Sequence, residues 1–207
     1  MGEETTRNKR RVVAERVNYF LLRIANLLTL ARLLATPLVV YLIWLTAEST
    51  DYDLATVGLI VALQATDVLD GYIARQAKAD LSDQRARVNP TGELLDPIAD
   101  KLYINSAVIT LMIIGRVPLW AGGLIVARDA FIAVGWLARY VLTGVRLLPN
   151  LLGKLADSAQ AILVIAVLLR LADPILTVWL WTVAALTVAS GLAYAKRALT
   201  ASQQVRG

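Results

Sequence analysis

The sequence contains no cysteine and no histidine. This absence excludes disulfides, thiol nucleophiles, imidazole acids and bases, and the zinc sites that these two residues build. Any enzymatic chemistry must therefore use carboxylates, lysines, arginines or hydroxyls. Any metal ligands must be oxygens, which favours hard cations such as Mg²⁺, Mn²⁺ or Ca²⁺.

Charged residues are also scarce. They make up 18% of the 207 residues, whereas hydrophobic residues make up 57% and the mean hydropathy is +0.60. This composition is typical of an integral membrane protein. The net charge of +5 therefore favours a membrane with anionic lipid, and not nucleic acid, as the partner of the basic residues.

Six stretches are apolar over the roughly 20 residues that a helix needs to cross a bilayer. They are Ala25–Thr46, Leu54–Tyr72, Glu93–Ile114, Pro118–Tyr140, Leu151–Leu171 and Pro174–Tyr194. The connections between them are short. The sequence therefore predicts an all-α integral membrane protein whose six transmembrane helices form one bundle, in a catalytic domain over residues 25–195.

The two ends of the chain and the links between the spans predict the orientation. Residues 1–24 combine a basic run with apolar side chains, which is typical of an amphipathic helix on the membrane surface, and residues 196–207 read as a short tail. Lys and Arg residues gather in loops on the cytoplasmic side. Sixteen fall in the N-terminal segment, the tail and the links after the second and fourth spans, against two on the other side. We expect an inner-membrane protein with both termini in the cytoplasm.

Four aspartates interrupt the second and third spans, although a charged side chain inside a span costs about 3 kcal/mol on insertion scales. Residues three, four and seven positions apart share a helix face. This spacing makes two stripes, one of Asp67, Asp70, Gly71 and Ala74 with Arg75 at its edge, and one of Gly92, Asp96 and Asp100. Both stripes fall at the predicted cytoplasmic ends of neighbouring antiparallel helices, so we expect the carboxylates to converge.

Four converging carboxylates repel each other strongly in a low-dielectric site. Either some are protonated, or divalent cations lie among them, and two metals roughly 4 Å apart would suit phosphoryl chemistry. Gly71 and Gly92 leave room for a phosphate-bearing group to approach the backbone. Arg75 can bind phosphate in a bidentate manner. One aspartate near a helix end is usually a cap, but this constellation favours a functional site.

The two stripes resemble the signature of the CDP-alcohol phosphotransferase family, D-x-x-D-G-x-x-A-R followed by G-x-x-x-D-x-x-x-D. The sequence fills every fixed position with Asp67, Asp70, Gly71, Ala74, Arg75, Gly92, Asp96 and Asp100. The resemblance covers nearly the whole chain, including the early stretch Asn26–Arg32. One departure is the sixteen-residue gap over 76–91, which is longer than usual in the family and puts the mouth of the site in doubt.

The resemblance implies a two-metal site for Mg²⁺ or Mn²⁺, a donor and a reaction. Asp67, Asp70 and Asp96 would be metal ligands, and Asp100 would complete the cluster and act as general base. The CDP moiety would contact Gly71, Ala74, Arg75 and Gly92. The acceptor hydroxyl would attack the lipid-linked phosphorus of CDP-diacylglycerol, and CMP would leave. The resemblance also implies a homodimer.

The acceptor alcohol stays open. Three basic residues on later helices, Arg128, Arg139 and Lys154, favour an anionic acceptor such as glycerol 3-phosphate. The alternatives are interfacial snorkelling for Arg139 and Lys154, and a local pair of Arg128 with Asp129. The sequence looks most like the phosphatidylglycerophosphate synthase and cardiolipin synthase branch. Its Arg-Asp step leans towards cardiolipin synthase, whose acceptor is phosphatidylglycerol, and inositol phosphate is a further alternative.

Two other classes of membrane protein use acidic side chains. A UbiA-type prenyltransferase binds a diphosphate through aspartates and Mg²⁺, but it usually needs more spans and has no role for the Gly-x-x-Ala-Arg element. A divalent-cation transporter needs acidic residues along a path that reaches both faces. Here the aspartates crowd one end of the predicted bundle, so both classes are distant alternatives.

Overall fold

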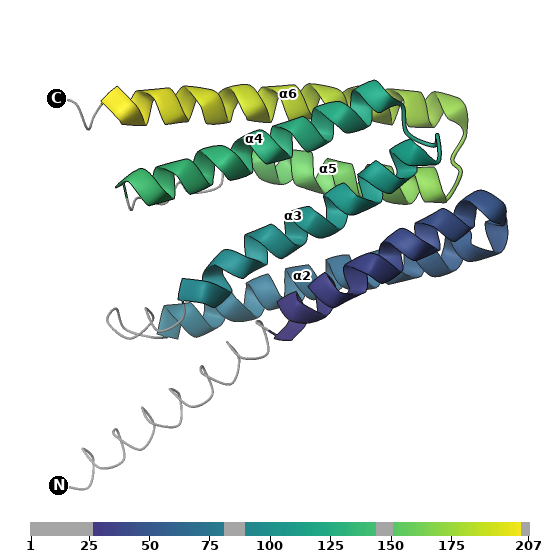
Figure 1. The fold of residues 1–207 in the computed structure, drawn as a ribbon, viewed down its shortest axis with the longest axis horizontal. Coiled ribbons are helices and arrows are strands. Elements are labelled where there is room, and N and C mark those ends of the chain that lie inside the picture. Colours follow the sequence, from purple (N-terminus) through teal and green to yellow (C-terminus); the bar gives the residue numbers. More distant parts are fainter. Residues whose placement is uncertain (1–26, 81–89, 144–150, 204–207) are drawn as a thin grey trace, which may run out of the picture. The chain divides into compact units, whose positions relative to one another are not determined.

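The computed structural model describes the backbone of residues 27–80, 90–143 and 151–203, and the side chains of residues 27–66, 101–135 and 151–197. Over these residues the chain is helical and contains no strand (Figure 1). A helix over Leu27–Glu48 is followed by a 3-10 turn and five helices: η1 (Thr50–Tyr52), α2 (Asp53–Asp80), α3 (Pro90–Ile113), α4 (Leu119–Thr143), α5 (Leu151–Leu168) and α6 (Asp173–Gln203).

The helices agree with the predicted segments, and the all-helical fold class is confirmed for this part of the chain. Among the described residues, three stretches are long and apolar enough to cross a membrane, namely Leu27–Glu48, Leu151–Leu168 and Asp173–Arg197. The apolar part of α3, Lys101–Ile113, is shorter. The total of six spans therefore stays a prediction. The predicted amphipathic helix over 1–24 lies outside the described residues.

The chain divides into two compact units. The first contains the residues up to Leu38 together with Gly58–Tyr103, and the second contains Val39–Val57 and Ile104–Gly207. In the first unit, the Tyr103 hydroxyl of α3 donates to the Ile60 carbonyl oxygen of α2 at 3.5 Å. Both residues are buried. Helix α3 begins where α2 ends and runs back along it, so the two helices are antiparallel (Figure 1).

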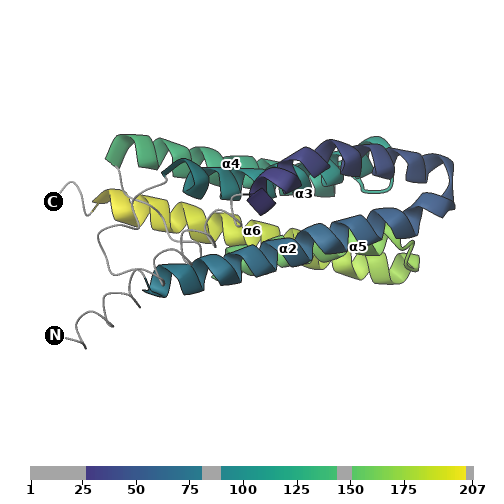
Figure 2. The same cartoon turned by 90° about the horizontal axis from the view of Figure 1, so that it is seen from below.

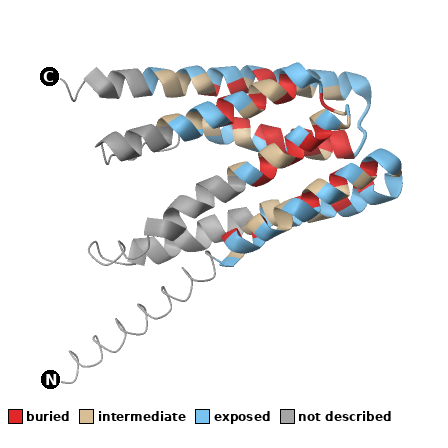
Figure 3. Ribbon diagram, in the orientation of Figure 1, coloured by how far each residue is buried: buried red, intermediate tan, exposed pale blue. Residues whose placement is uncertain are grey.

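In the second unit, α6 packs against both α4 and α5. Helices α4 and α6 run alongside each other in both views (Figures 1 and 2). One face of α5 is largely buried (Figure 3), and the Trp179 indole of α6 donates to the Ala159 carbonyl oxygen of α5 at 3.3 Å. Outward-facing Leu151, Val134 and Val178 stay exposed. Exposed large apolar side chains on successive helices are expected where lipid covers the surface.

The helices α3 and α5 end in the same kind of turn. Gly115 donates its backbone N–H to the Met112 carbonyl, and Arg170 donates to that of Val167. This is the Schellman arrangement, in which the residue after the helix takes a positive φ. Gly115 has φ 75° and Arg170 has φ 50°. Glycine tolerates this conformation, whereas a side chain raises its energy by about 1–2 kcal/mol, so other contacts must hold Arg170 in place.

Candidate active site and its polar surroundings

The acidic motif lies on two helices of the first unit. Asp67 and Asp70 are in α2, and Asp96 and Asp100 are in α3. The side chains of these four aspartates lie outside the described residues, and the same holds for the surroundings of Gly71, Ala74, Arg75 and Gly92. The backbone is helical across both segments, so the spacing that makes two stripes is retained.

The contact between Ile60 and Tyr103 sets the register of the two stripes. Asp67 follows Ile60 by seven residues, and Asp96 precedes Tyr103 by seven residues. In an antiparallel pair both displacements run in the same direction, by about 10 Å at 1.5 Å per residue. Seven residues are close to two turns, which returns to the same helix face. The contact therefore puts Asp67 and Asp96 within about one helical turn of each other along the pair.

The two glycines of the motif follow the same register. Gly71 lies eleven residues beyond Ile60, and Gly92 lies eleven residues before Tyr103. Both are therefore displaced by about 16 Å in the same direction. The register thus agrees with the convergence that the sequence predicts for the two stripes, at the level of the backbone.

The donor set of the motif suits Mg²⁺ or Mn²⁺, because four aspartates supply only carboxylate oxygens, which are the ligands that hard cations prefer. Among the residues whose side chains are described, no group of three or more acidic, histidine or cysteine side chains is present. The four aspartates of the motif lie outside that part of the chain, and the predicted two-metal site stays a prediction.

Arg128 of α4 lies at the centre of a buried network in the second unit. Its Nη1 is 2.6 Å from Oδ1 of Asp129 and 2.8 Å from Oδ1 of Asp157 on α5. Its Nε donates to the Ser190 hydroxyl oxygen of α6 at 2.9 Å. The Asn105 amide of α3 donates to Oδ2 of Asp129 at 3.0 Å. This network, which we name the Arg128 network, links four helices of the unit.

The Arg128 network pairs opposite charges in a largely buried position. One guanidinium meets two carboxylates, and Arg128 and Asp129 are 7% and 3% exposed. Only Asp157 reaches solvent appreciably, with 38% of its side chain exposed. The local pair between Arg128 and Asp129 that the sequence left open is therefore present. Arg128 is thus engaged by carboxylates of its own chain and is not a free cation for an anionic acceptor.

The other two predicted acceptor residues are placed only in part. Lys154 is exposed on α5, one turn before Asp157. Arg139 is in α4, and its side chain lies outside the described residues. The sequence did not predict that Asp157 and Ser190 are partners of Arg128. The signal that would have pointed to Asp157 is an unexplained acidic residue within an apolar span.

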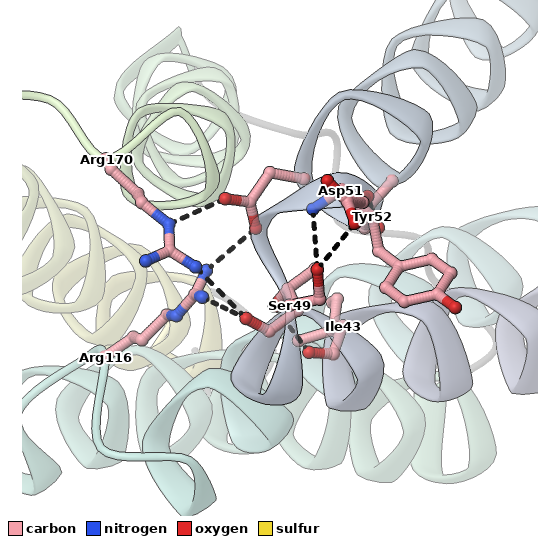
Figure 4. A network of polar contacts seen from close by, with 9 residues as sticks. Ile43, Ser49, Asp51, Tyr52, Arg116 and Arg170 are labelled. Atoms are coloured by element: carbon pink, nitrogen blue, oxygen red, sulfur yellow. Dashed lines mark hydrogen bonds and ion pairs between the residues drawn. The ribbon is translucent and has the colours of Figure 1, made fainter.

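A second network joins the turns of the second unit (Figure 4). Asp53, the first residue of α2, accepts from Arg116 at 3.3 Å and from Arg170 at 2.6 Å. The Thr46 carbonyl oxygen accepts from both guanidinium groups as well. We name these four residues the loop clasp. It explains why an arginine adopts the positive φ after α5, because the side chain of Arg170 is held by two partners there.

Similarity to known proteins extends over most of the chain. The model of the family described as CDP-alcohol phosphatidyltransferase matches residues 22–190. A CDP-diacylglycerol–glycerol-3-phosphate 3-phosphatidyltransferase of Bacillus subtilis is 31% identical over 185 residues, which cover 82% of this chain and 91% of the relative. A probable phosphatidylglycerophosphate synthase of Mycobacterium tuberculosis is 33% identical over 182 residues, which cover 85% and 81%.

A probable CMP-forming cardiolipin synthase of Drosophila melanogaster is 34% identical over 122 residues, which cover 58% of this chain but 34% of the relative. The chain thus spans about a third of the Drosophila melanogaster protein, but 91% of the Bacillus subtilis protein. The matched range 22–190 contains both acidic stripes and the Arg128 network. The resemblance that the motif predicted is confirmed, and this chain belongs to the CDP-alcohol phosphatidyltransferase family.

Proposed function

We propose that this chain transfers a phosphatidyl group from CDP-diacylglycerol to a hydroxyl of a glycerol-type acceptor, with release of CMP. The observation that carries the proposal is the complete acidic motif on α2 and α3 in a chain of this family. The similar level of Asp67 and Asp96 supports it, because carboxylates from both helices must come together to hold the cations that would bind one diphosphate.

Each residue of the motif has a part in this reaction. Gly71, Ala74, Arg75 and Gly92 bind the CDP moiety, and Asp67, Asp70, Asp96 and Asp100 hold Mg²⁺ or Mn²⁺. The bound cations would neutralise the diphosphate and the leaving CMP. Asp100 accepts the proton of the acceptor hydroxyl while the oxygen attacks the phosphorus. The bond from this phosphorus to the bridging oxygen breaks, and a phosphodiester remains.

Glycerol 3-phosphate is the first choice of acceptor. Relatives in Bacillus subtilis and Mycobacterium tuberculosis, which match over more than four fifths of both chains, carry names that refer to glycerol 3-phosphate or to phosphatidylglycerophosphate. Arg139 and Lys154 supply positive charge for an anionic acceptor, one on α4 and one on α5. Inositol phosphate would need the same positive charge and has no separate observation in its favour.

Phosphatidylglycerol is the second choice, and the reaction would then be that of a cardiolipin synthase. The Arg128 network favours it, because Asp129 and Asp157 already compensate the charge of Arg128. An acceptor that presents an uncharged glycerol headgroup does not require a free guanidinium there. The relative in Drosophila melanogaster carries the cardiolipin synthase name. Family membership argues against a UbiA-type prenyltransferase and a cation transporter.

We further propose that the reaction takes place at the cytoplasmic face of the inner membrane, in a homodimer of six-span chains. Charge counting supports the orientation. Ser190 is a small residue of a late helix and could in principle pack closely between copies, but it is buried within its own chain and bonded to Arg128. A dimer contact must therefore use other residues.

The experiment that tests the proposal measures CMP release from CDP-diacylglycerol by the purified chain in detergent. The acceptors are glycerol 3-phosphate, phosphatidylglycerol, inositol phosphate and none. We expect CMP only when a glycerol-type acceptor is present, and loss of activity when a chelator removes divalent cations. CMP release at the same rate without any acceptor, or no release with any of them, would contradict the proposal.

A further inference from the structure

The first unit contains a buried acceptor atom that has no donor. The side-chain oxygen Oε1 of Gln64, on α2, is buried and accepts no hydrogen bond. Buried polar atoms nearly always have a partner, since an unpaired one has given up its hydrogen bonds to water without replacing them. The Gln64 Oε1 atom therefore keeps an unused capacity to accept a hydrogen bond, which a donor group of a bound molecule could fill.

Gln64 lies on the stripe of α2 that leads into the acidic motif. It follows Ile60 by four residues and precedes Asp67 by three, so all three share a helix face. Along the antiparallel pair, Gln64 is about 6 Å from Ile60, and Asp100 is about 4.5 Å from Tyr103 in the same direction. Gln64 therefore lies within about one helical turn, along the pair, of the residue that we assign as the general base.

The chemistry of the amide limits what can bind it. A carbonyl oxygen accepts hydrogen bonds and cannot donate them, so its partner must be a donor such as a hydroxyl. The hydroxyl that attacks is the one beside Asp100. A glycerol-type acceptor carries a second hydroxyl on the adjacent carbon, within a few ångströms of the first. Glycerol 3-phosphate and the headgroup of phosphatidylglycerol share this pair of hydroxyls.

We propose that Gln64 Oε1 accepts a hydrogen bond from the hydroxyl next to the attacking one, and that Gln64 thereby selects acceptors with two neighbouring hydroxyls. This inference rests on the proposed function and names the part of the acceptor that the site recognises. It holds for either choice of acceptor. Gln64 is a specificity-determining residue in this assignment, and the proton transfer belongs to Asp100.

The test compares two acceptors that differ by one hydroxyl. The probes are glycerol 3-phosphate and 3-hydroxypropyl phosphate, which lacks the middle hydroxyl, with phosphatidylglycerol and its deoxy analogue as the lipid pair. In the unmodified protein, loss of the hydroxyl leaves a buried oxygen unpaired, and kcat/KM for the acceptor should fall roughly ten- to a hundredfold. In Gln64→Met, which has similar volume and no amide oxygen, this preference should disappear, while KM for CDP-diacylglycerol stays the same.

The control variant is Gln160→Met. Gln160 is a fully buried glutamine of α5 whose amide nitrogen and oxygen also lack partners, but it belongs to neither acidic stripe. This variant should retain the preference for the second hydroxyl, because the loss of a buried amide alone does not affect acceptor recognition. If Gln160→Met removed the preference as fully as Gln64→Met, a general effect on packing would replace our assignment.

A binding measurement separates this inference from the proposed function. The shift in unfolding temperature on adding each acceptor needs no turnover, and only the diol acceptor should give the larger shift in the unmodified protein. If CMP is released but both acceptors behave alike, or Gln64→Met keeps the full preference, the inference is wrong and the function stands. If no acceptor releases CMP, the proposed function is wrong. The shifts in unfolding temperature then still show whether Gln64 distinguishes the two acceptors. If Gln64→Met does not fold, Gln64→Asn is used in its place, because the shorter side chain withdraws the oxygen by one methylene.

Discussion

At the scale of single residues, Asp100 has the most demanding assignment, because it is both a metal ligand and the base. Asp100→Asn keeps the size of the side chain and one oxygen ligand, but its amide cannot accept the proton. We expect CMP release to fall roughly 100- to 10,000-fold, while binding of CDP-diacylglycerol is largely retained. The measurement is initial CMP release together with binding of CDP-diacylglycerol.

The matched control for this substitution is Asp51→Asn. Asp51 is an exposed aspartate of the 3-10 turn η1, and it accepts a hydrogen bond from Ser49 at 3.0 Å. This change removes the same charge outside the motif and should leave turnover intact. Normal turnover by Asp100→Asn would refute the assignment of the base, and another carboxylate of the motif would have to take its place.

Residue spacing predicted the acidic stripes, because i, i+3, i+4 and i+7 positions share a face in any helix. The pair of Arg128 with Asp129 was also visible, since the two are adjacent. The partners Asp157 and Ser190 were not, because they lie 29 and 62 positions away from Arg128. Such partners depend on how α4, α5 and α6 are rotated and aligned, which the local pattern of one sequence does not specify.

At the scale of helices, the Arg128 network should stabilise the packing of α4 against α5 and α6. Arg128→Leu removes the cation that Asp129 and Asp157 share and breaks the buried pair of Arg128 with Asp129, which should lower the free energy of unfolding by about 3–5 kcal/mol. Asp157→Asn should lower it by less than about 1 kcal/mol, because 38% of that side chain is exposed and an amide oxygen can still accept from Arg128. Thermal unfolding in detergent measures both variants.

The control for this pair is Lys154→Met, which changes an exposed charge on the same turn of α5 and should leave stability unchanged. Equal losses from Asp157→Asn and Arg128→Leu would mean that the α4–α5 contact, and not the burial of Asp129, determines the effect. The order of the two losses is therefore informative even where their absolute size depends on the detergent.

Helix positions were predictable from hydropathy, but helix ends were less so. The predicted second span ends at Tyr72, whereas α2 continues to Asp80. The hydropathy criterion measures how much of a helix fits in lipid, and a helix need not stop where its apolar stretch does. Residues 73–80 include three alanines together with Arg75, Gln76 and Lys78, which are strong helix formers. The backbone therefore stays helical beyond the apolar part.

At the scale of the whole molecule, the loop clasp limits how the helices of the second unit can cross a membrane. Asp53 contacts both Arg116 and Arg170, so the starts of α2 and α4 and the end of α5 lie on one side. Between Arg116 and Arg170 the chain passes through α4 and α5. If α5, which is long and apolar enough, crosses the membrane, α4 must cross it as well to bring both arginines to one side. The clasp thus supports more crossings than the three that length and hydropathy identify.

The absence of cysteine makes this arrangement directly testable by single-cysteine labelling with a membrane-impermeant maleimide. Thr50 and Ala172 are exposed, at η1 and before α6. Six spans put Thr50→Cys and Ala172→Cys on the same, non-cytoplasmic side, and Ser82→Cys on the cytoplasmic side. Three spans formed by Leu27–Glu48, α5 and α6 alone would put Thr50→Cys and Ala172→Cys on opposite sides. We expect Thr50→Cys and Ala172→Cys to react only in right-side-out vesicles and Ser82→Cys only in inverted vesicles, while the cysteine-free parent stays unlabelled in both.

Labelling of Thr50→Cys and Ser82→Cys from one side would mean that α2 does not cross, and the acidic motif would then have to be placed outside the bilayer.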